Sequence, residues 1–252
     1  MNSILKNNPI STAVIMAAGI GSRFGEYTKK NPKGFVNFSG TPMIIRSIDN
    51  LIQCGIKRII IGTGYKKEFY DALANRYSQI ECCYNPLYAN TNSMYTLFNC
   101  LSLIRKDNFL LLESDIIYEK KALSVLLDSK YEDIMLVAEL TKIQDQYFVE
   151  INNKNELTNC STDGSKLSPY GELIGIHKIS NGFFSEMCND YQKNIEKKYN
   201  LGYEYQILSI SQKILPMKVL KIDKLVWYEI DDEIDLLHAE EKYSKYLSYN
   251  GK

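Results

Sequence analysis

Short apolar runs alternate with amphipathic segments through the first half of the chain. Buried strands are predicted where a short apolar run is bounded by turn residues, as at residues 14–18, 59–62, 81–85 and 108–113. Helices are predicted where apolar residues recur every three or four positions, as at residues 41–55, 67–77 and 92–104. This alternation indicates a parallel sheet with helices on both faces.

The pattern changes after residue 134. β-like runs at residues 135–139, 147–151 and 172–178 are joined by polar turns, and a last strand at residues 227–231 precedes a closing helix with apolar positions at Leu236, Ala239, Tyr243, Tyr246 and Leu247. We expect an α/β fold with a Rossmann-like, mixed but mostly parallel sheet flanked by helices. A single domain (1–252) would have a nucleotide-binding half (about 10–134) and an acceptor-binding half (about 135–252) with a smaller β region.

The amino-acid composition limits the kinds of binding partner and the location that are expected. Lys plus Arg and Asp plus Glu both number 30 in 252 residues, so no global charge attracts nucleic acid or an anionic membrane, and neither partner is expected. The apolar run at residues 13–18 is too short for a membrane span and lacks a signal-peptide layout, which favours a cytoplasmic location. Six scattered cysteines without a CxxC spacing favour free thiols over zinc or disulfides.

The first predicted strand ends in a glycine loop. The loop reads Ala18-Gly19-Ile20-Gly21-Ser22-Arg23, and Pro32-Lys33 follows. Glycines let backbone N–H groups approach phosphate oxygens, while arginine and lysine add cations. The glycines alone fit a tight turn equally well. A Walker loop lacks its Gly-Lys-Ser/Thr, and a dinucleotide site lacks an acidic residue after the second strand.

The joint spacing Gly-x-Gly-Ser-Arg followed by Pro-Lys resembles the nucleotidyltransferases that activate sugars and small phosphate esters. The resemblance implies the nucleotide-diphospho-sugar transferase type of fold. It also implies that Ala18, Gly19, Gly21, Ser22 and Arg23 bind the triphosphate, and that Lys33 and Arg23 act at the reacting centre.

Two acidic residues at strand ends are candidate Mg²⁺ ligands. Magnesium prefers carboxylates together with phosphate oxygens and water. Asp115 follows a predicted strand at the edge where ligands of open α/β sheets gather, although a loop carboxylate or helix cap is an alternative. The resemblance selects Asp231 from an acidic stretch. Direct attack by an acceptor oxygen needs no enzyme nucleophile, and no Ser-His or Cys-His pair is evident.

The segment at residues 85–95 lies between the third strand and the next helix, where a nucleoside would bind. Asn85, Asn90 and Ser93 are candidates to contact the base and ribose, although a turn and an N-cap explain Asn90 and Ser93 equally well. The sequence pattern Asn-x-x-Tyr-x-x-x-Asn-x-x-Tyr resembles the one in choline-phosphate cytidylyltransferases and in their relatives that act on aminoethylphosphonate. That resemblance implies CTP as the donor.

An acceptor with a cationic head needs carboxylates or an aromatic cage. Candidates in the second half are Asp145, Tyr147, Glu172, Tyr203, Glu204, Tyr205, Trp227 and Glu229. A single Trp beside several Glu favours a primary amine. The choline branch has a second Trp next to the position of Glu204, which is absent here. The expected order is 2-aminoethylphosphonate, then phosphocholine, then phosphoethanolamine.

Two other functions stay open from the sequence. One is a sugar-1-phosphate nucleotidyltransferase that uses UTP, dTTP or GTP. The other is a non-catalytic nucleotide-sensing domain, against which the presence of Arg23, Lys33, Asp115 and Asp231 argues. A homodimer, or a fusion to a further enzyme, is compatible with the sequence.

Overall fold

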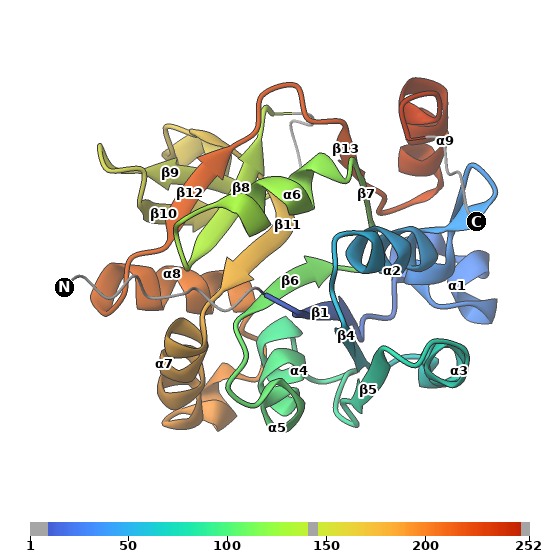
Figure 1. Cartoon of the computed structure of the whole chain (residues 1–252), viewed down its shortest axis with the longest axis horizontal. Coiled ribbons are helices and arrows are strands. Elements are labelled where there is room, and N and C mark those ends of the chain that lie inside the picture. The colour runs from blue at the N-terminus through green and yellow to red at the C-terminus, as the bar shows by residue number, and fades with distance from the viewer. Residues whose placement is uncertain (1–9, 141–145, 248–252) are drawn as a thin grey trace.

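The computed structural model describes residues 10–140 and 146–247, and within them a nine-stranded mixed sheet forms the centre (Figure 1). Its main path runs β10-β9-β11-β6-β1-β4-β5, with β8 beside β11 and β12 beside β8. The strands are β1 (Thr12–Ala17), β4 (Arg58–Thr63), β5 (Ile80–Tyr84), β6 (Phe109–Glu113), β8 (Ile134–Ala138), β9 (Phe148–Ile151), β10 (Leu157–Ser161), β11 (Gly171–Ile179) and β12 (Lys218–Lys221).

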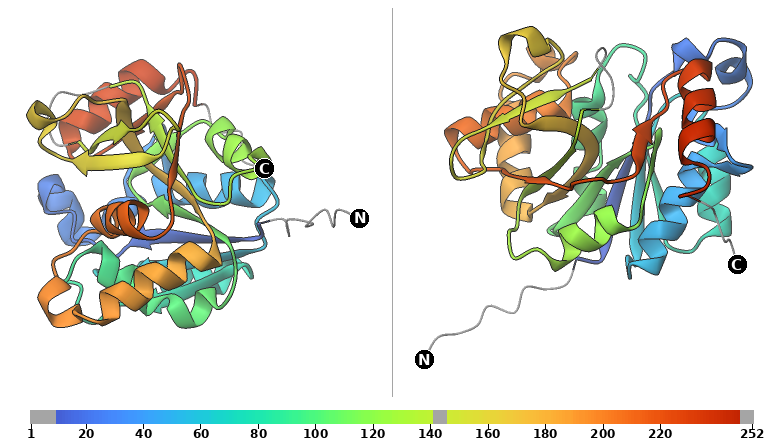
Figure 2. Two further views of the ribbon diagram at one scale, coloured as in Figure 1. Left: turned by 90° about the vertical axis from the view of Figure 1, so that its left-hand side faces the viewer. Right: turned by 90° about the horizontal axis from the view of Figure 1, so that it is seen from above.

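Helices cover both faces of this sheet (Figure 2). The helices are α1 (Glu26–Lys30), α2 (Met43–Gln53), α3 (Lys67–Arg76), α4 (Ser93–Asn99), α5 (Leu101–Ile104), α6 (Lys121–Asp128), α7 (Asn181–Gln192), α8 (Tyr203–Lys213) and α9 (Glu233–Tyr243).

Alternation along β1 explains the two hydrophobic layers. Ala13 and Ile15 face a cluster that includes α2, α3 and α6, whereas Val14 and Met16 face one that includes α4, α7 and α8. Every residue of β1 is buried, as expected for a central parallel strand. The strand is parallel to β4 and β6, so the carboxyl ends of these strands open on the same edge.

The last part of the chain returns to the sheet edge that carries the glycine loop. β13 (Trp227–Glu229) pairs antiparallel with β7 (Ile116–Tyr118), and α9 then packs near the hairpin of β2 (Asn37–Phe38) and β3 (Thr41–Pro42). Glu229 pairs with Ile116, and the Ile230 N–H donates to the Asp115 carbonyl at 3.0 Å. This pairing places the end of β13 beside the end of β6.

The predicted α/β class with a mixed, mostly parallel sheet is confirmed. β1 is parallel to β4 and β6, and β4 is parallel to β5, while β11 is antiparallel to β6, β8 and β9. The predicted helix at 92–104 is divided into α4 and α5 at Cys100. The predicted elements do not include helices α1, α6, α7 and α8, because between residues 134 and 227 only the β-like runs were interpreted and the apolar spacing in the regions of α1 and α6 was not used.

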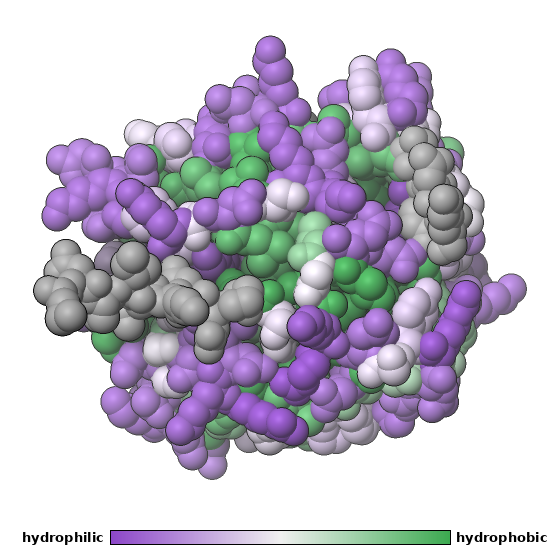
Figure 3. Space-filling view, in the orientation of Figure 1, coloured by the Kyte–Doolittle hydropathy of each residue, from purple (hydrophilic) through white to green (hydrophobic). Residues whose placement is uncertain are grey.

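The surface is mixed in character. On the face shown in Figure 3, hydrophilic residues predominate at the rim and a hydrophobic area lies near the centre. Among the described residues, Ile234 and Leu237 of α9 are exposed apolar side chains. No helix in the described ranges is both long and apolar enough to cross a membrane. The expected homodimer or fusion stays a prediction.

Candidate active site

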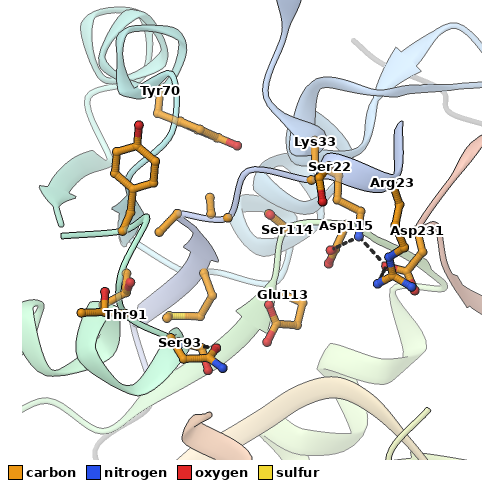
Figure 4. A pocket seen from close by; sticks show the side chains of 18 residues that line it. Ser22, Arg23, Lys33, Tyr70, Thr91, Ser93, Glu113, Ser114, Asp115 and Asp231 are labelled. Atoms are coloured by element: carbon orange, nitrogen blue, oxygen red, sulfur yellow. Dashed lines mark hydrogen bonds and ion pairs between the residues drawn. The ribbon is translucent and has the colours of Figure 1, made fainter. Parts of the chain in front are cut away.

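A pocket of about 330 Å³ lies at the carboxyl ends of β1 and β6 (Figure 4). Residues from the glycine loop, from the segment before α4 and from the ends of β6 and β13 converge on it. Its lining comprises Met16, Ala17, Ala18, Gly19, Gly21, Ser22, Arg23, Lys33, Tyr70, Tyr88, Thr91, Asn92, Ser93, Thr96, Glu113, Ser114, Asp115 and Asp231. The pocket therefore contains all the residues predicted from the loop, together with Ser93 and both aspartates.

The glycine loop folds back onto Lys33. Gly21 has φ +66°, which favours glycine, and a Cβ there would lie 2.9 Å from Lys33 Cβ. A short 3₁₀ turn, η1 (Ser22–Phe24), follows and directs Arg23 to the pocket. The loop thus needs glycine at this position for both its backbone conformation and its closeness to the lysine.

Lys33 lies between the two aspartates (Figure 4). Its Nζ donates to Asp115 Oδ2 at 2.5 Å and to Asp231 Oδ1 at 2.6 Å. Burial alone would lower the pKa of Lys33, but the negative charges of Asp115, Asp231 and Glu229 outweigh it and raise that pKa above the usual value. The lysine therefore stays protonated. Arg23 adds an ion pair with Asp231 at 2.8 Å.

Three carboxylates meet at the ends of β6 and β13. One oxygen from each of Asp115, Glu229 and Asp231 lies within 4.8 Å of the others. Asp115 Oδ1 is buried and has no hydrogen-bond partner among the described residues. Carboxylate oxygens, one of them without a hydrogen-bond partner, are ligands of the kind that Mg²⁺ takes together with water and phosphate oxygens. These residues fit Mg²⁺, and Glu229, which was predicted as an acceptor ligand, lies with the two aspartates.

The segment before α4 is held by Asn85. This residue is fully buried, and its Nδ2 donates to Thr91 Oγ1 at 3.0 Å and Thr96 Oγ1 at 2.9 Å, while its Oδ1 accepts from the Leu87 N–H. Asn85 thus lies behind the pocket and shapes the loop. Asn90 is exposed and does not line the pocket.

Ser93 connects this loop to the second half of the chain. It lines the pocket, and its Oγ accepts from the Tyr203 N–H of α8 at 2.9 Å. Thr91 and Asn92 line the same wall. Hydroxyl and amide groups at this wall are suited to the edge of a small base and to a ribose.

Several of the predicted acceptor residues cluster around α8. Burial raises the pKa of Glu204 to about 7. Burial raises the pKa of Tyr147, and the charges of Glu204 and Tyr205 raise it further. The rings of Tyr147 and Tyr205 meet edge to face, with their centroids 5.7 Å apart. Tyr203 is fully buried. These four side chains lie close enough together to interact.

None of the predicted acceptor residues that the structure describes is among the residues that line the pocket, and two of them are buried in the core or the sheet. Trp227 is 2% exposed and belongs to the hydrophobic core with Tyr118, its partner across the β13–β7 pair. Glu172 is 1% exposed on β11 and lines no part of the pocket described above. Asp145 falls outside the described residues.

Sequence reasoning missed Glu113, which lines the pocket two residues before Asp115 (Figure 4). Burial, then the charges of Asp115 and Glu204, hold its pKa well above the usual range. Glu113 could have been found from the sequence, because it is a charged residue at the end of an otherwise apolar strand. Tyr70, Tyr88 and Thr91 carried no comparable signal, because their approach to the pocket depends on tertiary packing.

The fold is that of the nucleotidyltransferases. The structure of CTP:phosphocholine cytidylyltransferase from Streptococcus pneumoniae superimposes with a TM-score of 0.78 at 21% identity, over 92% of this chain and 99% of that one. Residues 13–148 match the MobA-like NTP transferase domain, and the chain belongs to this family. It is therefore a nucleotidyltransferase.

Two curated relatives extend the comparison. A CTP:phosphoglutamine cytidylyltransferase from Campylobacter jejuni is 26% identical, with 89% of this chain and 97% of the relative covered. A 2-aminoethylphosphonate cytidylyltransferase from Lancefieldella rimae is 32% identical over a shorter match, 42% of this chain and 44% of the relative. Both relatives are named as cytidylyltransferases.

Proposed function

We propose that the protein is a Mg²⁺-dependent cytidylyltransferase that transfers CMP from CTP to a small amine-bearing phosphonate or phosphate and releases pyrophosphate. 2-Aminoethylphosphonate is the favoured acceptor, followed by phosphocholine. The observation that carries the proposal is Lys33, which lines the glycine-loop pocket and is held by Asp115 and Asp231. The names of the two relatives support CTP as the donor.

The reaction is a direct displacement at phosphorus. An anionic oxygen of the acceptor attacks the α-phosphorus of CTP and forms the new P–O bond. The bond from the α-phosphorus to the bridging oxygen breaks, and its electron pair leaves with pyrophosphate. The attacking oxygen is already deprotonated, so no general base is required.

The protein contributes position and charge. Backbone N–H groups of the loop from Gly19 to Ser22 orient the triphosphate, and Arg23 and Lys33 stabilise negative charge that develops during transfer. Asp115, Asp231 and Glu229 would hold Mg²⁺, which, when bound, neutralises phosphate oxygens and polarises the α-phosphorus. The wall with Thr91 and Ser93 would hold the nucleoside.

The test is a matrix of donors and acceptors with Mg²⁺. CTP, UTP, dTTP and GTP are each combined with 2-aminoethylphosphonate, phosphocholine, phosphoethanolamine, phosphoglutamine and a sugar 1-phosphate, and pyrophosphate is measured. Release with CTP and an amine-bearing acceptor is expected. Release only with UTP, dTTP or GTP and the sugar phosphate would identify a sugar nucleotidyltransferase instead. Nucleotide binding without release in any combination would indicate a sensing domain.

A further inference from the structure

Glu113 is a pocket residue for which nucleotidyl transfer provides no partner. It ends β6, lines the pocket and lies between Ser93 and Asp115 in Figure 4. Within the described ranges, no lysine or arginine forms an ion pair with Glu113, whereas Asp115 and Asp231 share Lys33. Glu113 is half-buried, and a carboxylate that is partly removed from water without a cation is costly unless a ligand supplies one.

The neighbouring strand is shaped to make room for Glu113. Gly175 of β11 has φ +70°, and a Cβ at this glycine would lie 2.9 Å from Glu113 Cγ. The β11–β8 register shifts between Leu173 and His177, which places the irregularity at this glycine. A side chain at position 175 would therefore press directly on Glu113.

A second carboxylate, Glu204, is accommodated in the same way. It lies in the first turn of α8, and a Cβ on Gly202 would lie 2.5 Å from Glu204 Oε2. No ion pair of Glu204 with a lysine or arginine is found in the part of the chain that the structure describes. Two glycines on different elements thus leave space for two carboxylates.

An unsatisfied hydroxyl lies between these groups. Tyr203 is 0% exposed, and its hydroxyl has no hydrogen-bond partner in bonding geometry among residues 10–140 and 146–247. Its ring meets His177 edge to face with centroids 5.5 Å apart, which fixes the ring from behind. Burial, then the charges of Glu113 and Glu204 and the approach of the Glu113 carboxylate as a hydrogen-bond acceptor, raise the pKa of Tyr203. The hydroxyl and the two carboxylates therefore form one polar group that a ligand with several donors could join.

We propose that Glu113 and Glu204, with the Tyr203 hydroxyl, form the subsite for a primary ammonium group of the acceptor, and that Glu113 determines specificity for it. A primary ammonium carries three N–H donors and one positive charge, which suits two carboxylates and a phenolic oxygen. A quaternary ammonium has no donors and would leave these oxygens unsatisfied. This inference depends on the proposed function, because it assigns the head group of the acceptor.

The experiment compares acceptors with and without the amine. kcat/KM is measured with CTP and Mg²⁺ for 2-aminoethylphosphonate, ethylphosphonate and phosphocholine, in the wild type, Glu113→Gln, Glu204→Gln and the exposed-residue control Glu68→Gln. The wild type is expected to prefer 2-aminoethylphosphonate to ethylphosphonate by roughly 10- to 100-fold, the range of one or two charge-assisted hydrogen bonds. Glu113→Gln should reduce this preference to within about threefold, and Glu68→Gln should retain it.

Four outcomes would overturn the inference. Equal kcat/KM values for 2-aminoethylphosphonate and ethylphosphonate in the wild type would show that no ammonium subsite exists. If Glu113→Gln lowers kcat/KM equally for both phosphonates, Glu113 supports the fold. If the variant needs more Mg²⁺ with both phosphonates, Glu113 belongs to the metal site. If Glu113→Gln does not fold, an unchanged preference in Glu204→Gln would reject the subsite and a reduced one would support it. Absence of CTP turnover with every acceptor would instead refute the proposed function.

Discussion

Lys33 and Asp231 lie 198 positions apart in the sequence, yet the lysine Nζ is 2.6 Å from the aspartate Oδ1. The same ammonium is 2.5 Å from Asp115, so one cation bridges carboxylates that lie two residues beyond the ends of β6 and β13. Because Lys33 also packs against Gly21, it connects the glycine loop to both acidic strand ends. The proposed reacting centre is therefore a single interconnected group.

Replacement of this lysine tests its contribution to transfer. Lys33→Met keeps much of the side-chain length but removes the charge. We expect kcat for pyrophosphate release from CTP to fall by roughly 100- to 1,000-fold, as for loss of one transition-state donor. Lys29→Met, which changes an exposed lysine on α1, should retain activity. Comparable activity in both variants would exclude Lys33 from the reacting centre.

Metal dependence tests the carboxylate group. Chelation with EDTA should abolish turnover by the wild type, and Asp115→Asn should lower kcat by about 100-fold while raising the Mg²⁺ concentration needed for half-maximal rate. The matched control is Asp128→Asn, an exposed aspartate at the end of α6. The measurement is the rate of pyrophosphate release against Mg²⁺ concentration. An unaltered metal dependence in Asp115→Asn would contradict the assignment.

The loop before α4 should depend on Asn85. Asn85→Ala removes three hydrogen bonds in a fully buried position and leaves Thr91 without its donor, so we expect a loss of about 1–3 kcal/mol in unfolding free energy. The KM for CTP should rise because the pocket wall is no longer fixed. Asn90→Ala, at an exposed position, should have a much smaller effect. Chemical denaturation and CTP saturation curves measure the two quantities, and equal effects in both variants would reject this role.

Stability should depend on pH through Glu204. Burial raises its pKa from 4.5 to about 7, so folding favours the protonated form. The stability associated with this group is present below pH 4.5, declines as pH rises, and is fully lost above about pH 7. Urea unfolding at pH 5 and pH 8, without ligands, should show a smaller pH difference for Glu204→Gln than for the wild type. An identical difference in both proteins would show that Glu204 titrates normally.

Local spacing explains why the loop and its lysine could be predicted. The residues from Ala18 to Arg23, with Lys33, are near one another in the sequence, so their chemistry is visible without a fold. Asp115 followed from the end of a recognisable strand. Asp231 could be selected only through the resemblance to a known family, because several acidic residues beside it offer the same chemistry. All of these residues except Ile20 line one pocket.

The proposed acceptor region could not be predicted to the same extent. Glu113 owes its place to Gly175 on another strand, and Glu204 to the N-terminal turn of a helix that was not predicted. Trp227, the single tryptophan, was predicted to bind the acceptor, but its ring is part of the hydrophobic core at the β13–β7 pair. These positions depend on contacts between distant elements, which hydrophobic periodicity does not reveal. The assignment of nucleotide and acceptor roles to the two halves stays a prediction.

The pairing of β13 with β7 also has a consequence for when the carboxylate group forms during synthesis. Residues 13–148, which match the family, emerge from the ribosome with Lys33 and Asp115 but without Glu229 and Asp231. A growing chain at that stage carries only one of the three carboxylates that meet in the folded protein. The group is therefore completed late, when β13 pairs with β7 after most of the chain has been synthesised.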